Sequence, residues 1–312
     1  MTEIINRVLP IILLIALGFW TRRSGFLTPR TIDELRKIVV NLALPAVLFI
    51  AFLDVELESR YAVVVVTVFL LGIVLFLLGR ALQPRFGAQH GYFPFLMTGF
   101  EAGMLGISLY GAAYGLDHVG SFATVDLGQE IFIWFVFLAL LLAKRDGTRD
   151  SRALVASFIR SPVVVAIIAG IAMNLAGARE VLYDAPIMGG VMNTLAFIGT
   201  LTVPLILLVV GYGIQLDREG IKEAAAPVAV RAAILLPLAL ILPPLLMGRL
   251  LDTDAYAQAA LFTLLILPPP FIIPLYMKPD VGDERRYVNN VLSLYTVVSI
   301  VVFIGYVSLN PL

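Results

Sequence analysis

The sequence predicts an all-α polytopic membrane protein with ten transmembrane helices in two inverted five-helix repeats, of which helices four and nine are broken and cross. Three observations support this prediction: the composition, the lengths of the apolar runs, and the distribution of basic residues. Of 312 residues, 60% are hydrophobic and 14% are charged, whereas an ordinary soluble domain has roughly 25% charged residues. The mean hydropathy is +0.96. The lipid bilayer is therefore the expected surroundings of most of the chain.

Ten apolar runs are each close to the roughly 20 residues that a transmembrane helix needs. They cover residues 4–21, 37–54, 60–80, 92–115, 121–143, 161–178, 187–214, 224–250, 256–277 and 287–309. The first run lacks the basic start and small-residue cleavage site of a secretory signal, so it is expected to remain as a transmembrane helix.

The basic residues predict the orientation. Seventeen of the 22 Lys and Arg residues fall in the stretches 22–37, 80–91, 144–160, 215–223 and 278–286, and only Arg7, Arg60, Arg179 and Arg249 fall on the opposite side. By the positive-inside rule, both termini should face away from the cytoplasm in the plasma (inner) membrane. Arg231, near the cytoplasmic start of span eight, is expected to snorkel to the interface.

Several classes of function are excluded or disfavoured. The formal net charge is zero, so no global field attracts nucleic acid. The chain has no cysteine and only two histidines, His90 and His118, which argues against a metal site or a thiol cofactor. No H-E-x-x-H, G-x-S-x-G or nucleotide-binding loop is present. We therefore expect neither an enzyme nor a cofactor, and no ATP hydrolysis on this chain.

The chain divides into a first repeat (1–143), a cytoplasmic loop (144–160) and a second repeat (161–312). "NLALPAVLF" in span two resembles "TLTVPLILL" in span seven, and their prolines, Pro45 and Pro204, are predicted to kink the two helices. An odd number of spans per half places the second copy upside down in the membrane, as in many secondary transporters.

Spans four and nine are predicted to be discontinuous. Span nine contains "LPPPFIIPLY", in which Pro268, Pro269, Pro270 and Pro274 each remove a backbone donor. Span four, "GFEAGMLGISLYGAAYG", is rich in glycine and contains the carboxylate of Glu101. Irregular backbone at membrane depth is tolerated where protein buries it or where it lines a wet cavity. Two half-helix N-termini facing a shared pocket would favour an anion.

The order and spacing of six segments resemble the auxin efflux carrier family, which includes plant PIN-type carriers and bacterial permeases, within the superfamily of the bile acid:sodium symporters. These segments are "LPIILLIALGFWTRRSGFLT", "VVNLALPAVLF", "GMLGISLYGAAYG", "DLGQEIFIWFVFLALLL", "PPPFIIPLYM" and "NNVLSLYTVVSI". The resemblance covers essentially the whole chain. It implies a scaffold domain of spans 1, 2, 6 and 7, a transport domain of spans 3–5 and 8–10 that moves like an elevator, and a homodimer formed through the scaffold.

The sequence departs from the family pattern N-x-x-x-x-G-[I/L]-P in span four, where Glu101 and Ser108 replace Asn and Pro. Without that proline, Gly103 and Gly106 are expected to break the helix. Three roles are open for Glu101: a proton carrier, a cap on broken-helix backbone, or a mimic of a substrate carboxylate that would favour a neutral or cationic cargo.

The remaining candidate residues follow from the same two breaks and from span five. Substrate contacts are predicted at Glu101, Gly103, Gly106, Ser108, Pro268, Pro269, Pro270, Ile272 and Asn290. Proton or ion coupling is predicted at Glu101, Gln129 and Glu130, since Asp126 and Glu130 share one face of span five.

The leading hypothesis is a secondary transporter of a small organic anion, such as a mono- or dicarboxylate or an auxin-like acid, coupled to protons through Glu101. A sodium-coupled symporter is the alternative, with carbonyls near Pro268–Pro270 and the carboxylates as oxygen ligands. A third hypothesis, from another class, is a membrane sensor or scaffold that moves nothing.

Overall fold

The computed structural model describes residues 2–55, 60–146, 160–214, 218–277, 282–310 and 312. This part of the chain is helical and contains no strand. Six of its helical segments, some of which join several helical elements, are long and apolar enough to cross a membrane: Pro29–Asp54, Tyr61–Phe86, Leu116–Arg145, Pro186–Gly213, Gly220–Leu250 and Gly282–Leu309. Shorter apolar helices cover Pro162–Leu175 and Ala255–Ile266. The predicted all-α membrane class is confirmed at this level.

The first half contains helices α1 (Thr2–Arg23), α2 (Pro29–Ile38), α3 (Leu44–Asp54), α4 (Tyr61–Phe86), α5 (Phe93–Leu96), α6 (Ile107–Tyr114), α7 (Val119–Phe132) and α8 (Leu138–Asp146). The π-helical turns η1 (Val39–Ala43), η2 (Ala102–Gly106) and η4 (Ile133–Phe137) and the 3₁₀ turn η3 (Leu116–His118) lie between them. Thr28 caps α2 by accepting a hydrogen bond from the Thr31 amide. Pro45 lies in the first turn of α3, directly after η1.

The second half contains α10 (Pro162–Leu175), α11 (Arg179–Asp184), α12 (Pro186–Thr200), α13 (Thr202–Gly213), α14 (Arg218–Leu242), α15 (Ala255–Ile266) and α16 (Gly282–Leu309), with η5 (Pro243–Leu250) and η6 (Ile273–Leu275). Span seven is interrupted at Leu201, and Pro204 lies in the first turn of the helix that follows. The two related prolines thus both follow a local irregularity of their helix.

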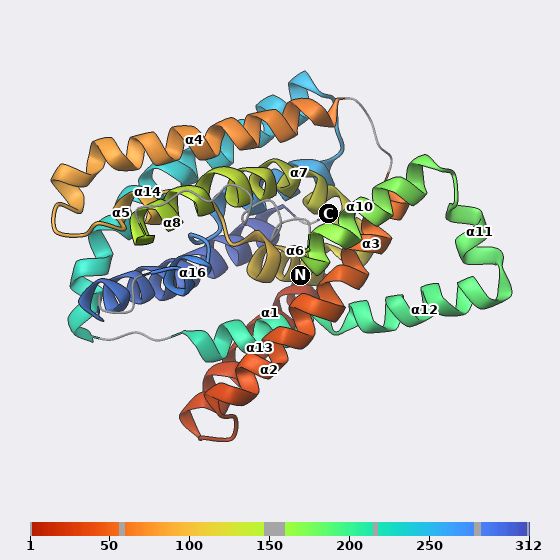
Figure 1. Cartoon of the computed structure of the whole chain (residues 1–312), viewed down its shortest axis with the longest axis horizontal. Coiled ribbons are helices and arrows are strands. Elements are labelled where there is room, and N and C mark those ends of the chain that lie inside the picture. Colours follow the sequence, from red (N-terminus) through yellow and green to blue (C-terminus); the bar gives the residue numbers. More distant parts are fainter. Residues whose placement is uncertain (1, 56–59, 147–159, 215–217, 278–281, 311) are drawn as a thin grey trace.

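The closest helix pairs are α1 with α13, α3 with α10, α4 with α7, and α14 with α16 (Figure 1). These helices correspond to predicted spans 1 and 7, 2 and 6, 3 and 5, and 8 and 10. The first span of each half therefore packs against the second span of the other half. The third span of each half packs against the fifth span of the same half. Glycines permit the first three of these approaches, because a Cβ would lie against partner-helix backbone at Gly18, Gly128, Gly170 and Gly211.

The helices form two groups (Figure 1). Helices α4, α8, α14 and α16 lie on one side of the molecule, and α2, α3, α12 and α13 lie on the other. Most of the predicted cytoplasmic loop 144–160, including Arg149 and Arg152, and also Lys278 lie outside the described residues. The domain limits drawn from the sequence therefore stay predictions.

Candidate functional site

The first break interrupts the segment 92–115. Helix α5 ends at Leu96, residues 97–101 are irregular, and the chain becomes helical again at Ala102. Gly99 lies in this irregular stretch with a φ of +70°, a conformation that L side chains adopt rarely. The expectation that Gly103 and Gly106 break the helix is wrong, because both lie in the π turn η2.

Ser108 occupies the position at which the family pattern has proline. It lies inside α6, buried, and its hydroxyl donates to the Met104 carbonyl oxygen over 2.7 Å. Because serine keeps its backbone N–H, the helix passes through this position, and the irregular backbone ends earlier, at Glu101. In this chain the break therefore lies on the N-terminal side of Ser108.

The second break interrupts the segment 255–277. Asp254 caps the start of α15 through the Ala257 amide at 2.8 Å, and the helix ends at Ile266. Of the seven residues 268–274, four are prolines without a donor, so no regular helix continues. Between Leu267 and Met277, the described backbone contains only the 3₁₀ turn η6. The second half-helix expected in this segment is therefore reduced to one short turn.

The two breaks touch each other. The backbone N–H of Glu101 donates to the Pro268 carbonyl oxygen over 2.9 Å. A Cβ on Gly99 would lie 2.9 Å from Cγ of Pro270, so the close approach needs glycine at this position. The predicted contact between the broken segments therefore exists at backbone level.

The side chain of Glu101 joins the amide ends of both breaks. One carboxylate oxygen accepts a hydrogen bond from the Met104 N–H at 3.3 Å, and the other accepts from the Phe271 N–H at 2.5 Å. The first bond caps the helix that restarts at Ala102. A carboxylate thus already occupies the electropositive position that the sequence predicted for an anion.

Whereas Glu101 binds backbone amides of the two breaks, Arg231 binds backbone carbonyl oxygens of the same two breaks. Its guanidinium donates to the carbonyl oxygens of Leu96 (3.1 Å), Gly99 (2.6 Å) and Leu267 (3.2 Å). The residue is 1% exposed. It lies thirteen residues after Arg218, the start of α14, which is about 20 Å along the axis. The expected snorkelling is therefore wrong: the partners of the guanidinium lie inside the protein.

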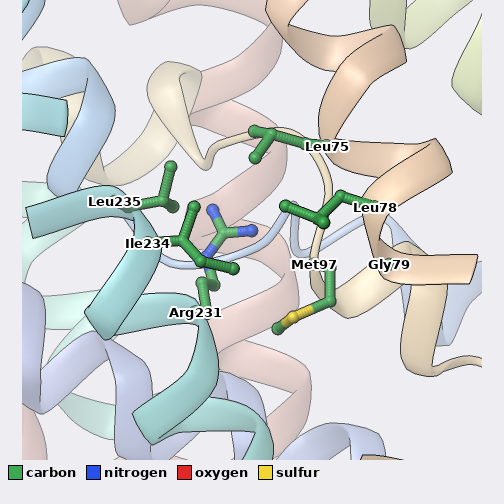
Figure 2. Close-up of a pocket in the computed structure, with 7 residues that line it drawn as sticks. All are labelled: Leu75, Leu78, Gly79, Met97, Arg231, Ile234 and Leu235. Atoms are coloured by element: carbon green, nitrogen blue, oxygen red, sulfur yellow. The ribbon is translucent and has the colours of Figure 1, made fainter. Parts of the chain in front are cut away.

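Figure 2 shows the guanidinium of Arg231 between α4 and α14. The space around it is narrow and leaves no room for a water molecule. Its other lining residues are Leu75, Leu78, Gly79, Met97, Ile234 and Leu235. The apolar lining removes competing water, which strengthens the bonds of the guanidinium to the three carbonyls.

Helix α7 brings polar groups to the first break. Gln129, 3% exposed, donates from Nε2 to the Phe100 carbonyl oxygen at 2.6 Å and to Oδ1 of Asp126 at 3.4 Å. Glu130 accepts from the indole N–H of Trp134 at 2.9 Å. Gln129 therefore positions the break, whereas Glu130 bonds along its own helix. Among the described residues, no group of three or more Asp, Glu or His side chains is arranged to hold a metal ion.

The other predicted residues differ in their relation to the crossing. Gly106 faces it closely, since a Cβ would lie 2.7 Å from Cδ1 of Leu267. Gly103 has space, because the nearest atom to a Cβ would be 3.9 Å away on Leu44 of α3. Asn290 is buried, and a Cβ on Gly220 of α14 would meet its side chain. Ile272, directly before η6, is half-buried.

Sequence reasoning missed two residues. It assigned Arg231 to the interface, although an arginine inside an apolar run was a signal for a buried partner. It did not consider Ser299 of α16, whose hydroxyl donates to the Ile266 carbonyl oxygen at 2.6 Å. Serine is compatible with a helix interior and recurs in α16, at Ser293 and Ser308, so Ser299 carries no comparable signal in the sequence.

Comparison with known proteins adds one finding. A family model described as membrane transport protein matches residues 3–307. No curated protein matches the chain.

Proposed function

Because the chain belongs to the membrane transport protein family, we propose that it is a secondary transporter of a small organic anion, coupled to protons through Glu101. Mono- and dicarboxylates and auxin-like acids are the substrate classes concerned. The single observation that supports this proposal best is the position of the Glu101 carboxylate, which accepts one amide hydrogen bond from each broken segment.

The proposed mechanism exchanges one carboxylate for another. An ionised Glu101 fills the two amides and excludes an external anion. Protonation turns the carboxyl group into a donor and weakens it as an acceptor, so the amides of Met104 and Phe271 become available to the carboxylate of a substrate. One proton on Glu101 then accompanies one negative charge of the substrate. This arrangement couples the two without ATP.

Two further parts of the proposal concern movement and assembly. Each close helix pair has a counterpart in which the two halves of the chain change places: α1 with α13 matches α10 with α3, and α4 with α7 matches α14 with α16. This pairing supports ten spans in two inverted repeats. The side-by-side groups of helices in Figure 1 support a scaffold of spans 1, 2, 6 and 7 and a transport domain of spans 3–5 and 8–10 that moves as an elevator. Exposed apolar side chains on α12, such as Ile187 and Phe197, suit a homodimer through the scaffold in the plasma (inner) membrane.

Uptake into proteoliposomes tests the function. Purified protein is exposed to labelled acetate, succinate and indole-3-acetate with an imposed pH gradient. We expect uptake of at least one acid that rises when the outside is made acidic, and loss of this pH dependence in E101Q. The control E34Q removes an exposed carboxylate of α2 and should behave like the parent. An unchanged pH profile in E101Q contradicts proton coupling, and flux of none of these acids contradicts the proposed substrate class.

A second candidate is a carrier of neutral or cationic cargo. It is favoured by the observation that Glu101 already satisfies the two amides, while Asp126 and Glu130 add further carboxylates on α7. The absence of cysteine allows a direct test with G103C as the only thiol. Faster reaction with a trimethylammonium thiosulfonate reagent than with a sulfonate reagent, even in the E101Q background, would favour a cationic cargo.

A further inference from the structure

We propose that Arg231 is a fixed internal cation that takes the place of a coupling sodium ion at the crossing, so that this carrier works without sodium. This inference rests on the transporter function proposed above. The alternative that the sequence left open was sodium held by unwound carbonyls and carboxylates. The contacts around the second break favour Arg231 over a bound sodium ion as the cation at this position.

Carbonyl oxygens at the ends of broken helices are the groups that hold a hard monovalent cation in membrane carriers. In this protein, three such oxygens, from Leu96, Gly99 and Leu267, converge on one guanidinium at 2.6–3.2 Å. Both breaks contribute to the set. The positively charged group at this position therefore belongs to the chain itself.

The neighbouring carbonyls of the second break also have partners. The hydroxyl of Ser299 donates to Ile266, and the N–H of Glu101 donates to Pro268. Together with the bond from Arg231 to Leu267, three consecutive carbonyls are occupied by protein donors. A sodium ion would have to displace at least one of these bonds.

The charge of Arg231 is permanent and enclosed. A guanidinium keeps its proton throughout the physiological pH range. Its carbon lies 5.3 Å from the ring centroid of Phe100 and 5.1 Å from that of Tyr295, distances at which cation–π attraction operates. None of the ion pairs between described side chains involves Arg231. A second cation beside it would meet uncompensated repulsion in a medium of low dielectric constant.

Thermal unfolding of the detergent-solubilised protein tests this inference without any organic anion. The unfolding midpoint of the parent, R231Q and R231K is measured with choline chloride replaced stepwise by sodium chloride at constant ionic strength. We expect the same midpoint at every sodium concentration for the parent and for R231K, which keeps a cation. R231Q should have a lower midpoint in choline, and sodium should raise it in a saturable way.

The exposed Arg249 lies on the same continuous helix, and R249Q is the matched control that should show no response to sodium. A sodium response of the parent, or none in R231Q, contradicts the inference. If R231Q cannot be obtained folded in choline, the readout is the amount of folded protein recovered in sodium. The same experiment is done with R231A, whose smaller side chain leaves more space for the ion. Failure of sodium to rescue either neutral variant also contradicts the inference. None of these outcomes bears on whether an organic anion is carried.

Discussion

The amide side and the carbonyl side of the crossing are both held by charged side chains, but in different ways. Glu101 joins two amides from a position that is half-buried. Arg231 joins three carbonyls and is 1% exposed. A group that must be exchanged for cargo has to be reachable, whereas a group that fixes the backbone gains from exclusion of water. In the mechanism proposed above, exchange takes place on the amide side, and the carbonyl side supports the backbone.

The largest expected effect is on the carbonyl side. R231M removes every donor to three backbone oxygens in a pocket without water, and leaving buried acceptors unsatisfied costs about 1–3 kcal/mol each. We expect the free energy of unfolding to fall by at least about 3 kcal/mol, measured by reversible unfolding in mixed micelles. If R231M lost less free energy of unfolding than E101Q, the carbonyl side would not be the main support of the backbone at the crossing.

An intermediate effect is expected at the backbone contact itself. G99A forces a Cβ onto a residue with a φ of +70° and places it 2.9 Å from Pro270 and from Ile133. We expect a loss of about 1–3 kcal/mol in the free energy of unfolding. The matched control is G103A, in η2, where a Cβ meets nothing closer than 3.9 Å. Its stability should stay equal or rise by up to about 1 kcal/mol, and equal losses in both variants would contradict the steric argument.

The smallest effect on stability is expected on the amide side. E101Q keeps one acceptor oxygen and the shape of the side chain, so it should lose about 1 kcal/mol in the same unfolding measurement. Although E101Q should change stability little, we expect it to abolish the pH dependence of uptake. A variant that unfolds as readily as R231M would show that Glu101 supports the backbone and is not exchanged.

Outside the membrane, one ionisable cluster ties the two halves together. Arg179 of α11 donates to Asp54 of α3 over 2.7 Å, and the hydroxyl of Tyr183 donates to the same carboxylate over 2.8 Å. Partial burial and this hydrogen bond raise the pKa of Tyr183 to about 12. Both charged partners are accessible to solvent, so the pair contributes little to stability.

The sequence by itself determined the helical membrane class, the family and the two segments, 92–115 and 256–277, in which regular helix fails. Apolar runs, prolines and glycines act locally, through hydrophobic transfer and lost backbone donors, and so are visible in one dimension. The resemblance to the auxin efflux carrier family is confirmed by the family match, while the exact ten-span inverted repeat stays a prediction.

Only the tertiary structure decided which side chains hold the crossing. The pairing of Arg231 with carbonyls from residues 132 to 135 positions away, and that of Glu101 with Phe271, depend on how four helices pack. The tertiary structure also placed the first break at residues 97–101, where Gly99 has a positive φ and approaches Pro270 of the second break. Hydrogen bonds between distant segments have no signature in local sequence, since any buried donor finds whichever acceptor the packing brings near.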